Sequence, residues 1–99
     1  MSPEQIRNTS QDERADIYSF GCVVYELVCG RPPYAGETGN DLLLKHLRAP
    51  IPSAKAVNPN VTDEFSEVIK SLLAKEPNQR PASMTEVLRY LRGVNVFVA

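Results

Sequence analysis

The chain has no tryptophan, one histidine and two cysteines among its 99 residues. It also has no apolar run near the roughly 20 residues that span a bilayer, so no membrane segment is expected. The N-terminus lacks the basic-then-apolar order of a secretory signal, and the expected location is therefore the cytoplasm. Charge of one sign is not in excess either: a net charge of −1 gives no basic surface for nucleic acid, which is not expected as a partner.

The two cysteines, Cys22 and Cys29, lie in one apolar, periodic segment. In a helix their spacing gives about 10.5 Å of axial rise, whereas a disulfide needs Cα atoms within roughly 7 Å. Both are predicted to be reduced residues of the core, which fits a reducing cytosol. Two cysteines with one distant histidine do not form a zinc-binding set. We interpret His46 as a surface residue of a short helix.

Hydrophobic periodicity predicts an all-α domain of about five helices. The first begins at Ser2, where a proline follows a capping serine. The central helix is expected to begin with Asp16 as its cap, to end at Gly30, and to be buried on most sides. Gly21 lies in its middle at a cost of about 1 kcal/mol relative to alanine, which predicts that another backbone packs closely there.

Three further helices are expected after the central one. Asn40 is predicted to cap the first and Thr62 the second, and a Ser83–Glu86 capping box opens the third, which ends at Gly93. Residues 49–60 carry three prolines and are predicted to be an extended connector. The domain is expected to span residues 1–93. Residues 94–99 form a tail that alternates like a strand but has no evident partner.

Motifs for catalysis are missing from the chain. It has no glycine-rich phosphate loop, no GxSxG elbow and no HExxH zinc motif, so no catalytic, cofactor-binding or metal-binding residue is assigned. Two polar residues still need an explanation, Glu4 on the opening helix and Arg80 in the turn NQRPAS. Periodicity alone favours interpreting both as solvated surface charges.

Three stretches in order resemble a known family: SPEQ, then DIYSFGCVVYELVCGRPPY, then LLAKEPNQRP followed by a capped helix. Together they are similar to the second half of the C-terminal lobe of protein kinases, in the style of bacterial serine/threonine kinases. The resemblance covers about residues 1–92. It implies a partial kinase C-lobe, a helical half-lobe around one buried central helix.

The resemblance gives roles to the two unexplained polar residues. Ser2, Pro3 and Glu4 match the Ala-Pro-Glu motif that closes the activation segment of kinases, with serine in place of alanine. Glu4 is then implied to form a buried ion pair with Arg80. This reverses the surface interpretation of both residues.

The resemblance also assigns residues of the central helix. Asp16 matches the aspartate that hydrogen-bonds the backbone of the catalytic loop, and Gly21 fits the close packing expected there. Val23 and Leu27 fall where this helix contributes to the apolar stack that runs up to the adenine ring. Glu26 aligns with a position that contacts basic residues of peptide substrates in some kinases.

For the complete kinase, the resemblance implies phosphorylation of a protein substrate with ATP and Mg²⁺. The glycine-rich loop, the strand lysine and helix glutamate, the H-R-D aspartate, the catalytic-loop asparagine and the D-F-G aspartate are not in these 99 residues. The chain alone is therefore predicted to be inactive. Two hypotheses stay open: a C-terminal fragment of a serine/threonine kinase, with Met1 an internal methionine, or a standalone helical module that binds a protein partner. Self-association through exposed apolar surface is expected for the fragment.

Overall fold

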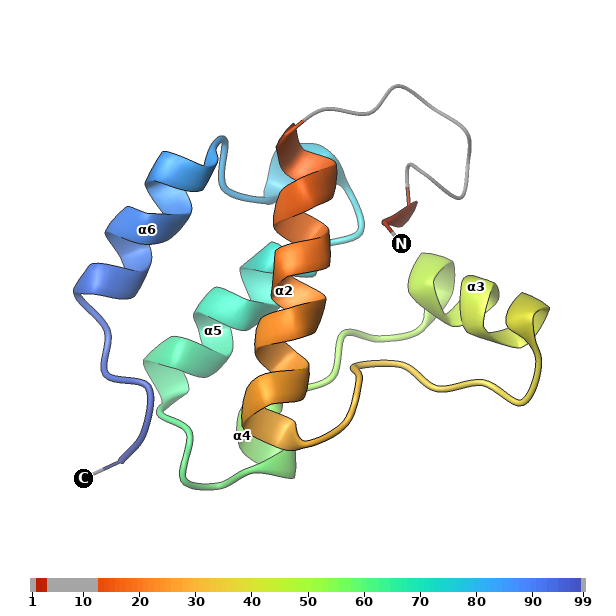
Figure 1. The fold of residues 1–99 in the computed structure, drawn as a ribbon, viewed down its shortest axis with the longest axis horizontal. Coiled ribbons are helices and arrows are strands. Elements are labelled where there is room, and N and C mark those ends of the chain that lie inside the picture. Colours follow the sequence, from red (N-terminus) through yellow and green to blue (C-terminus); the bar gives the residue numbers. More distant parts are fainter. Residues whose placement is uncertain (1, 4–12, 99) are drawn as a thin grey trace.

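The computed structural model describes residues 2–3 and 13–98. This part of the chain forms five α-helices and one turn of 3₁₀ helix (Figure 1): α2 (Glu13–Cys29), α3 (Gly39–Arg48), α4 (Ala54–Val57), α5 (Asp63–Leu72), η1 (Pro77–Gln79) and α6 (Met84–Arg92). The predicted all-α class, with about five helices, is confirmed for these residues. The predicted opening helix lies mostly outside the described residues, although Ser2 and Pro3 are buried.

Helix α2 forms the centre of the core. Two clusters of buried side chains meet along it. The larger cluster joins α2 to α4 and α5 through Tyr18, Tyr25, Ala54, Val61, Phe65, Ile69 and Leu73. The smaller cluster joins α2 to α5 and α6 through Ile17, Leu72 and Val87. Helix α5 therefore packs against α2 through an apolar stripe that contains Phe65, Ile69 and Leu72.

The molecule leaves one face of α2 uncovered. It measures 41 × 31 × 17 Å, and a helix with its side chains is about 10–12 Å across. The short dimension therefore has no room for helices on both faces of α2, and Figure 1, viewed along this dimension, shows α2 in front of α5. Val23 is 55% exposed and Leu27 78% exposed. The prediction that the central helix is buried on most sides is wrong for this face.

The starts of two helices differ from the prediction. Helix α2 begins at Glu13, so Asp16 lies in its first turn and is not the cap. Helix α3 is capped by Thr38, whose hydroxyl accepts a hydrogen bond from the Asp41 N–H at 3.1 Å, and not by Asn40. Thr38 has the extended backbone of a cap residue, whereas Asn40 is already inside the helix.

The predicted caps of α5 and α6 are confirmed. Thr62 accepts the N–H of Phe65 at 3.1 Å, and Ser83 accepts the N–H of Glu86 at 3.2 Å. The Glu86 carboxylate accepts the backbone N–H of Ala82 at 3.0 Å, one residue before the cap.

The predicted helix ends are also confirmed. Gly93 is the C-cap residue of α6. Gly30 follows α2 with φ +76°, a left-handed conformation that glycine adopts without steric cost.

The connector and the tail both contain structure that was not predicted. Residues 54–57 of the connector form α4, with the Ser53 hydroxyl accepting the N–H of Ala56 at 3.3 Å. The tail forms an isolated antiparallel bridge between Val61 and Phe97, and the N–H of Thr62 donates to the carbonyl of Val96 at 3.0 Å. The tail therefore has a partner, which corrects the prediction.

Cys22 and Cys29 are free thiols, but both are half-buried against the larger cluster and do not lie inside the core as predicted. Within residues 2–3 and 13–98, no helix is long and apolar enough to cross a membrane. The described residues also contain no cluster of three or more potential metal ligands.

Candidate functional site

The uncovered face of α2 carries most of the residues that the resemblance singled out. Asp16, Val23 and Leu27 follow one another at helical spacing along one side of the helix, and all three are exposed. Glu26 is exposed beside them. The face is acidic at its N-terminal end and apolar further on, and in this chain it faces solvent.

Gly21 lies against α5. A Cβ atom built on Gly21 would be 2.8 Å from the Cβ of Leu72 and 3.2 Å from a methyl carbon of Leu73. Both distances are below ordinary van der Waals contact. The close approach predicted at Gly21 is therefore confirmed, and it sets the distance between α2 and α5.

Arg80 is a buried cation, only 4% exposed. Its Nε–H donates to the carbonyl of Ala74 at 2.8 Å, and its two terminal nitrogens donate to the carbonyls of Arg14 at 2.9 Å and Lys75 at 3.2 Å. The guanidinium carbon also lies 4.8 Å from the centroid of the Tyr18 ring. Interpreting Arg80 as a surface charge is therefore wrong.

The ion pair implied for Arg80 stays a prediction, because Glu4 lies outside the described residues.

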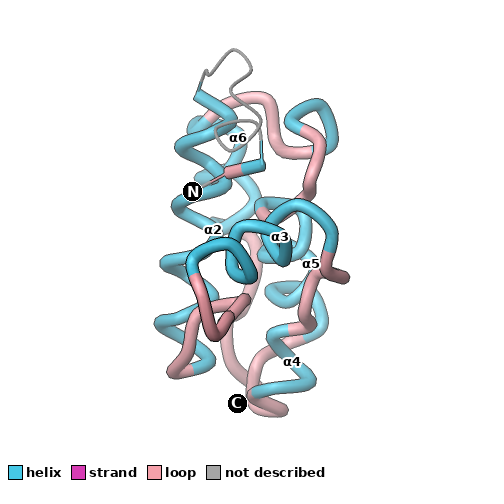
Figure 2. The backbone as a smooth tube through the Cα atoms, turned by 90° about the vertical axis from the view of Figure 1, so that its right-hand side faces the viewer, coloured by secondary structure: helices cyan, strands magenta, loops and turns pink. Residues whose placement is uncertain are grey.

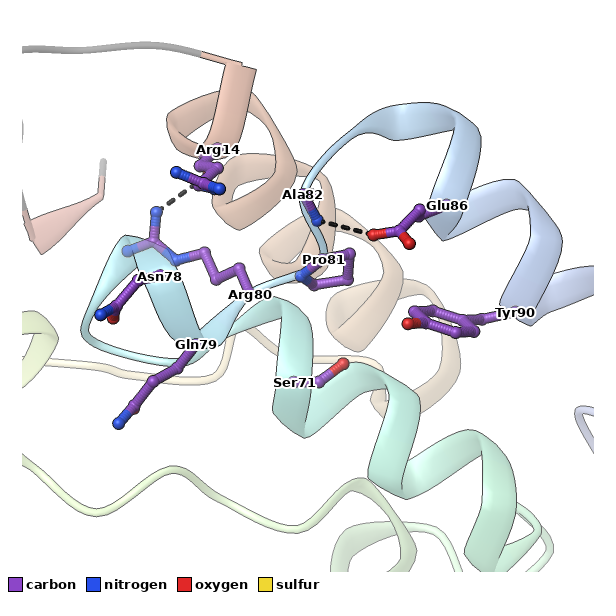
Figure 3. A pocket seen from close by; sticks show the side chains of 9 residues that line it. All are labelled: Arg14, Ser71, Asn78, Gln79, Arg80, Pro81, Ala82, Glu86 and Tyr90. Atoms are coloured by element: carbon purple, nitrogen blue, oxygen red, sulfur yellow. Dashed lines mark hydrogen bonds between the residues drawn. The ribbon is translucent and has the colours of Figure 1, made fainter.

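An open polar hollow of about 380 Å³ lies beside Arg80, between η1 and the N-terminal ends of α2 and α6 (Figure 3). Figure 3 shows the two hydrogen bonds that fix its walls, from Arg80 to the backbone of Arg14 and from the N–H of Ala82 to Glu86. A third bond, from the N–H of Met84 to the Glu13 carboxylate at 2.8 Å, joins the starts of α6 and α2. These polar groups therefore fix the relative positions of three chain segments.

A second polar cluster was not predicted. The hydroxyl of Tyr18 lies 2.8 Å from Nδ1 of His46, and the His46 ring packs edge-on against Tyr34 with centroids 4.9 Å apart. Lys75 donates from its ammonium group to the Tyr34 hydroxyl at 2.8 Å and to the His46 carbonyl at 2.7 Å. His46 is half-buried, so its interpretation as a surface histidine is wrong.

This cluster joins residues far apart in the sequence, so no local pattern could reveal it. Tyr18 and His46 are 28 positions apart, and Lys75 and Tyr34 are 41 positions apart. The one available signal is the buried face of α2: a tyrosine there needs a hydrogen-bond partner for its hydroxyl. The prediction placed Tyr18 on an apolar helix but sought no such partner.

Burial shifts the pKa values of His46, Lys75 and Tyr34 so that the charged form of each is disfavoured. Burial lowers the pKa of His46 to about 4, with the charge of Lys75 adding to the effect. It lowers the pKa of Lys75 to about 8 and raises the pKa of Tyr34 to about 12. At pH 7 the imidazole is therefore neutral, so its Nδ1 accepts a hydrogen bond from the Tyr18 hydroxyl if the ring proton is on Nε2 and donates one if the proton is on Nδ1.

The lowered pKa of His46 predicts a loss of stability in mild acid. The ring takes up its proton near pH 6.5 in the unfolded chain but near pH 4 in the folded one. The unfolded state therefore binds more protons between these values, and stability falls as the pH drops from 6.5 to 4. We expect His46 to account for roughly 1–2 kcal/mol of this loss, once its partial exposure to solvent is taken into account.

Urea denaturation at pH 7, 6, 5 and 4 measures this loss for the chain and for His46→Gln. Carboxylates titrate in both proteins, so the difference between the two slopes isolates the histidine. Equal slopes would contradict the prediction.

Comparison with known proteins identifies the family. Residues 1–91 match the protein kinase domain. The chain is 39% identical over 83 residues to the DNA damage-responsive serine/threonine-protein kinase RqkA of Deinococcus radiodurans, covering 84% of this chain and 12% of the relative. It is 42% identical over 80 residues to the serine/threonine-protein kinase PrkC of Bacillus subtilis, covering 81% of this chain and 12% of the relative.

A third relative, the serine/threonine-protein kinase PknB of Mycolicibacterium smegmatis, is 38% identical over 88 residues, which cover 88% of this chain and 14% of the relative. The chain thus spans about an eighth of the length of these relatives.

The three ordered motifs, the all-helical fold and these matches agree. The chain belongs to the protein kinase family and is of the bacterial serine/threonine type.

Proposed function

We propose that this chain is the C-terminal helical part of a cytoplasmic serine/threonine kinase domain, which in its complete form phosphorylates a protein substrate with ATP and Mg²⁺. The observation that carries the proposal is the exposed apolar face of α2. In most small domains the central helix is covered, whereas here Val23 and Leu27 are more than half exposed. A chain that matches part of a kinase domain and exposes its central helix has a surface for the rest of that domain.

The proposal gives this chain a structural role and the rest of the kinase the catalytic groups. The groups that bind ATP and Mg²⁺ and orient the substrate hydroxyl belong to motifs that these 99 residues do not contain. This chain would supply a rigid base, with Asp16 contacting the catalytic loop and Val23 and Leu27 packing beneath the nucleotide site. Glu26 would contact basic residues of the substrate. Alone, the chain would transfer no phosphate, because catalysis needs the missing groups together.

A phosphoryl-transfer assay with a complementary polypeptide tests the proposal. The partner is the kinase domain of the Bacillus subtilis relative, cut just before the residue that aligns with Ser2. We expect no Mg²⁺-dependent transfer to a generic basic protein by either piece alone. We expect association of the two pieces, and transfer by the mixture. Transfer by the 99-residue chain alone would overturn the division of work, and failure to associate would count against the proposed surface.

The second candidate function is a standalone helical module that binds a protein partner, such as an intact kinase, through the same α2 face. The exposed apolar face supports this candidate as well. The two functions differ in what the mixture does: a module would associate with the complementary piece or with an intact kinase but restore no transfer. Transfer by the mixture therefore favours the kinase part.

Replacing Leu27 by lysine is expected to reduce self-association of the isolated chain. Leu27 is 78% exposed, so the change adds charge to an apolar patch and removes little buried area. We expect several-fold less binding of a hydrophobic dye and a shift from dimer or aggregate towards monomer in analytical ultracentrifugation.

The matched control is Leu44→Lys on α3, where the leucine is 51% exposed but away from α2. This variant is expected to associate like the original chain. If Leu27→Lys leaves dye binding and association unchanged, the α2 face is not the surface through which the chain self-associates.

A further inference from the structure

Helix α3 lies apart from the other helices. It forms one side of the molecule in Figure 1 and lies across the front in Figure 2, which is turned by 90°. All ten of its residues are described, and none is buried. Helices α2, α4, α5 and α6, by contrast, each place at least one side chain in the core. Leu42, Leu43 and Leu47 are only half-buried, so apolar burial contributes less to holding α3 than it does for the helices of the core.

Polar contacts add to this limited apolar burial. The ammonium group of Lys75 donates to two carbonyls in the last turn of α3, those of Lys45 at 3.2 Å and His46 at 2.7 Å. These carbonyls lie at the negative end of the helix dipole, where a cation is favoured. The same ammonium group donates to the Tyr34 hydroxyl and lies 4.2 Å from the centroid of that ring.

The side chain of His46 makes the second connection. Its ring lies between Tyr18, which is fully buried in α2, and Tyr34, which is buried in the loop before α3. One residue of α3 is therefore held by the core helix through its side chain and by Lys75 through its carbonyl.

The segments on either side of α3 are not helical. Gly30, with φ +76°, begins the segment that enters α3. Ala49 leaves the helix in an extended conformation, immediately before Pro50. A proline prevents the helix from continuing. The helix is therefore bounded on both sides by segments that do not continue it.

We propose that Lys75, His46, Tyr18 and Tyr34 form a latch, the α3 latch, which holds α3 against the body of the domain and whose opening releases α3 while the α2–α5 core stays folded. The latch is a conformational device of the fold, and it does not depend on the proposed kinase function. Lys75 is its central residue because it contacts both α3 and the preceding loop.

Hydrogen exchange in the full 99-residue chain tests the latch, with Lys75→Met as the variant and Lys70→Met as the matched control. Lys70 is an exposed lysine on α5 and lies outside the latch. In Lys75→Met we expect the amides of residues 44–49 to exchange at least tenfold faster, while those of residues 66–73 keep their protection. Lys70→Met should exchange like the original chain. Unchanged protection of residues 44–49 in Lys75→Met would overturn the proposal.

The His46 ring gives a second, local measurement by NMR titration. In the closed latch the pKa of His46 is about 4, and in the open latch it should move towards the ordinary value near 6.5. If Lys75→Met unfolds the whole chain, Tyr18→Phe provides the test, because it removes one hydroxyl and keeps the core ring. We expect Tyr18→Phe to raise the pKa of His46 and to speed exchange in α3 alone. A His46 pKa that stays near 4, with α3 still protected, would overturn the latch.

Discussion

Replacing Gly21 by valine is expected to lower the free energy of unfolding of the chain by about 3 kcal/mol or more. The first added carbon would lie 2.8 Å from the Cβ of Leu72, an atom next to the α5 backbone that no rotamer change can move. Relief therefore requires α2 and α5 to separate, which disturbs both buried clusters. Overpacking of this kind costs typically 1–3 kcal/mol per site and occasionally more, and valine adds two further methyl groups. The free energy of unfolding of a small domain is only about 5–15 kcal/mol in total, so this loss is a large part of it.

Alanine at the same position gives a graded test. Alanine favours a helix by about 1 kcal/mol over glycine, so a variant without a steric clash would become more stable. We expect Gly21→Ala to lose about 1–3 kcal/mol instead, measured by urea denaturation followed by circular dichroism.

The control for this series is Gly39→Ala at the start of α3, where no described atom lies within 4 Å of the added carbon. This change is expected to be neutral or slightly stabilising. A Gly21→Ala variant as stable as the original chain would show that α5 can move away at no cost.

Local patterns account for much of this fold. The caps at Thr62 and Ser83 and the glycines that end α2 and α6 are all signals carried within a few residues, and each was predicted. Gly21 extends this reasoning, since a glycine inside a helix indicates close packing before the packing partner is known. The glycine at position 21 alone was therefore enough to predict that another element packs closely against α2 there.

The errors have a common physical origin in contacts between distant segments. The strand-like tail pairs with residues more than 30 positions away, through a few backbone hydrogen bonds. The proline-rich connector reads as extended because Pro50 and Pro52 precede the Ser53 cap, after which α4 forms. His46 was interpreted from its neighbours on α3, whereas its environment comes from Tyr18 and Tyr34. None of these partners could be predicted from a local window.

The prediction that α2 is buried on most sides failed for a different reason. The period of apolar residues shows which side chains avoid water, but not which molecule covers them. Periodicity predicted burial on most sides for the central helix that carries Val23 and Leu27, whereas the resemblance assigned both residues to the apolar stack of a complete kinase. Their exposure of 55% and 78% contradicts the first assignment. It agrees with the second, which stays a proposal until the complementary piece is tested.

Replacing Arg80 by methionine is expected to cost about 3–5 kcal/mol. The change keeps the apolar stem but removes the donors for three carbonyls, those of Arg14, Ala74 and Lys75. Buried carbonyls that lose their donors each carry a desolvation penalty. The stability of Arg80→Lys should lie between those of the original chain and Arg80→Met, because one ammonium group cannot reproduce a planar guanidinium that donates in several directions. The measurement is urea denaturation.

The control for Arg80 is Arg89→Met on the exposed side of α6, expected to change stability by less than about 0.5 kcal/mol. A double-mutant cycle with Glu4→Gln then separates two roles of Arg80. If Arg80 serves only the three carbonyls, the effects of the two substitutions add. If the implied ion pair with Glu4 exists, they are non-additive by about 1 kcal/mol or more, because each single change leaves the other charge without its partner. Additive effects would show that Arg80 stabilises the domain through the backbone carbonyls that it binds. They would contradict the ion pair with Glu4.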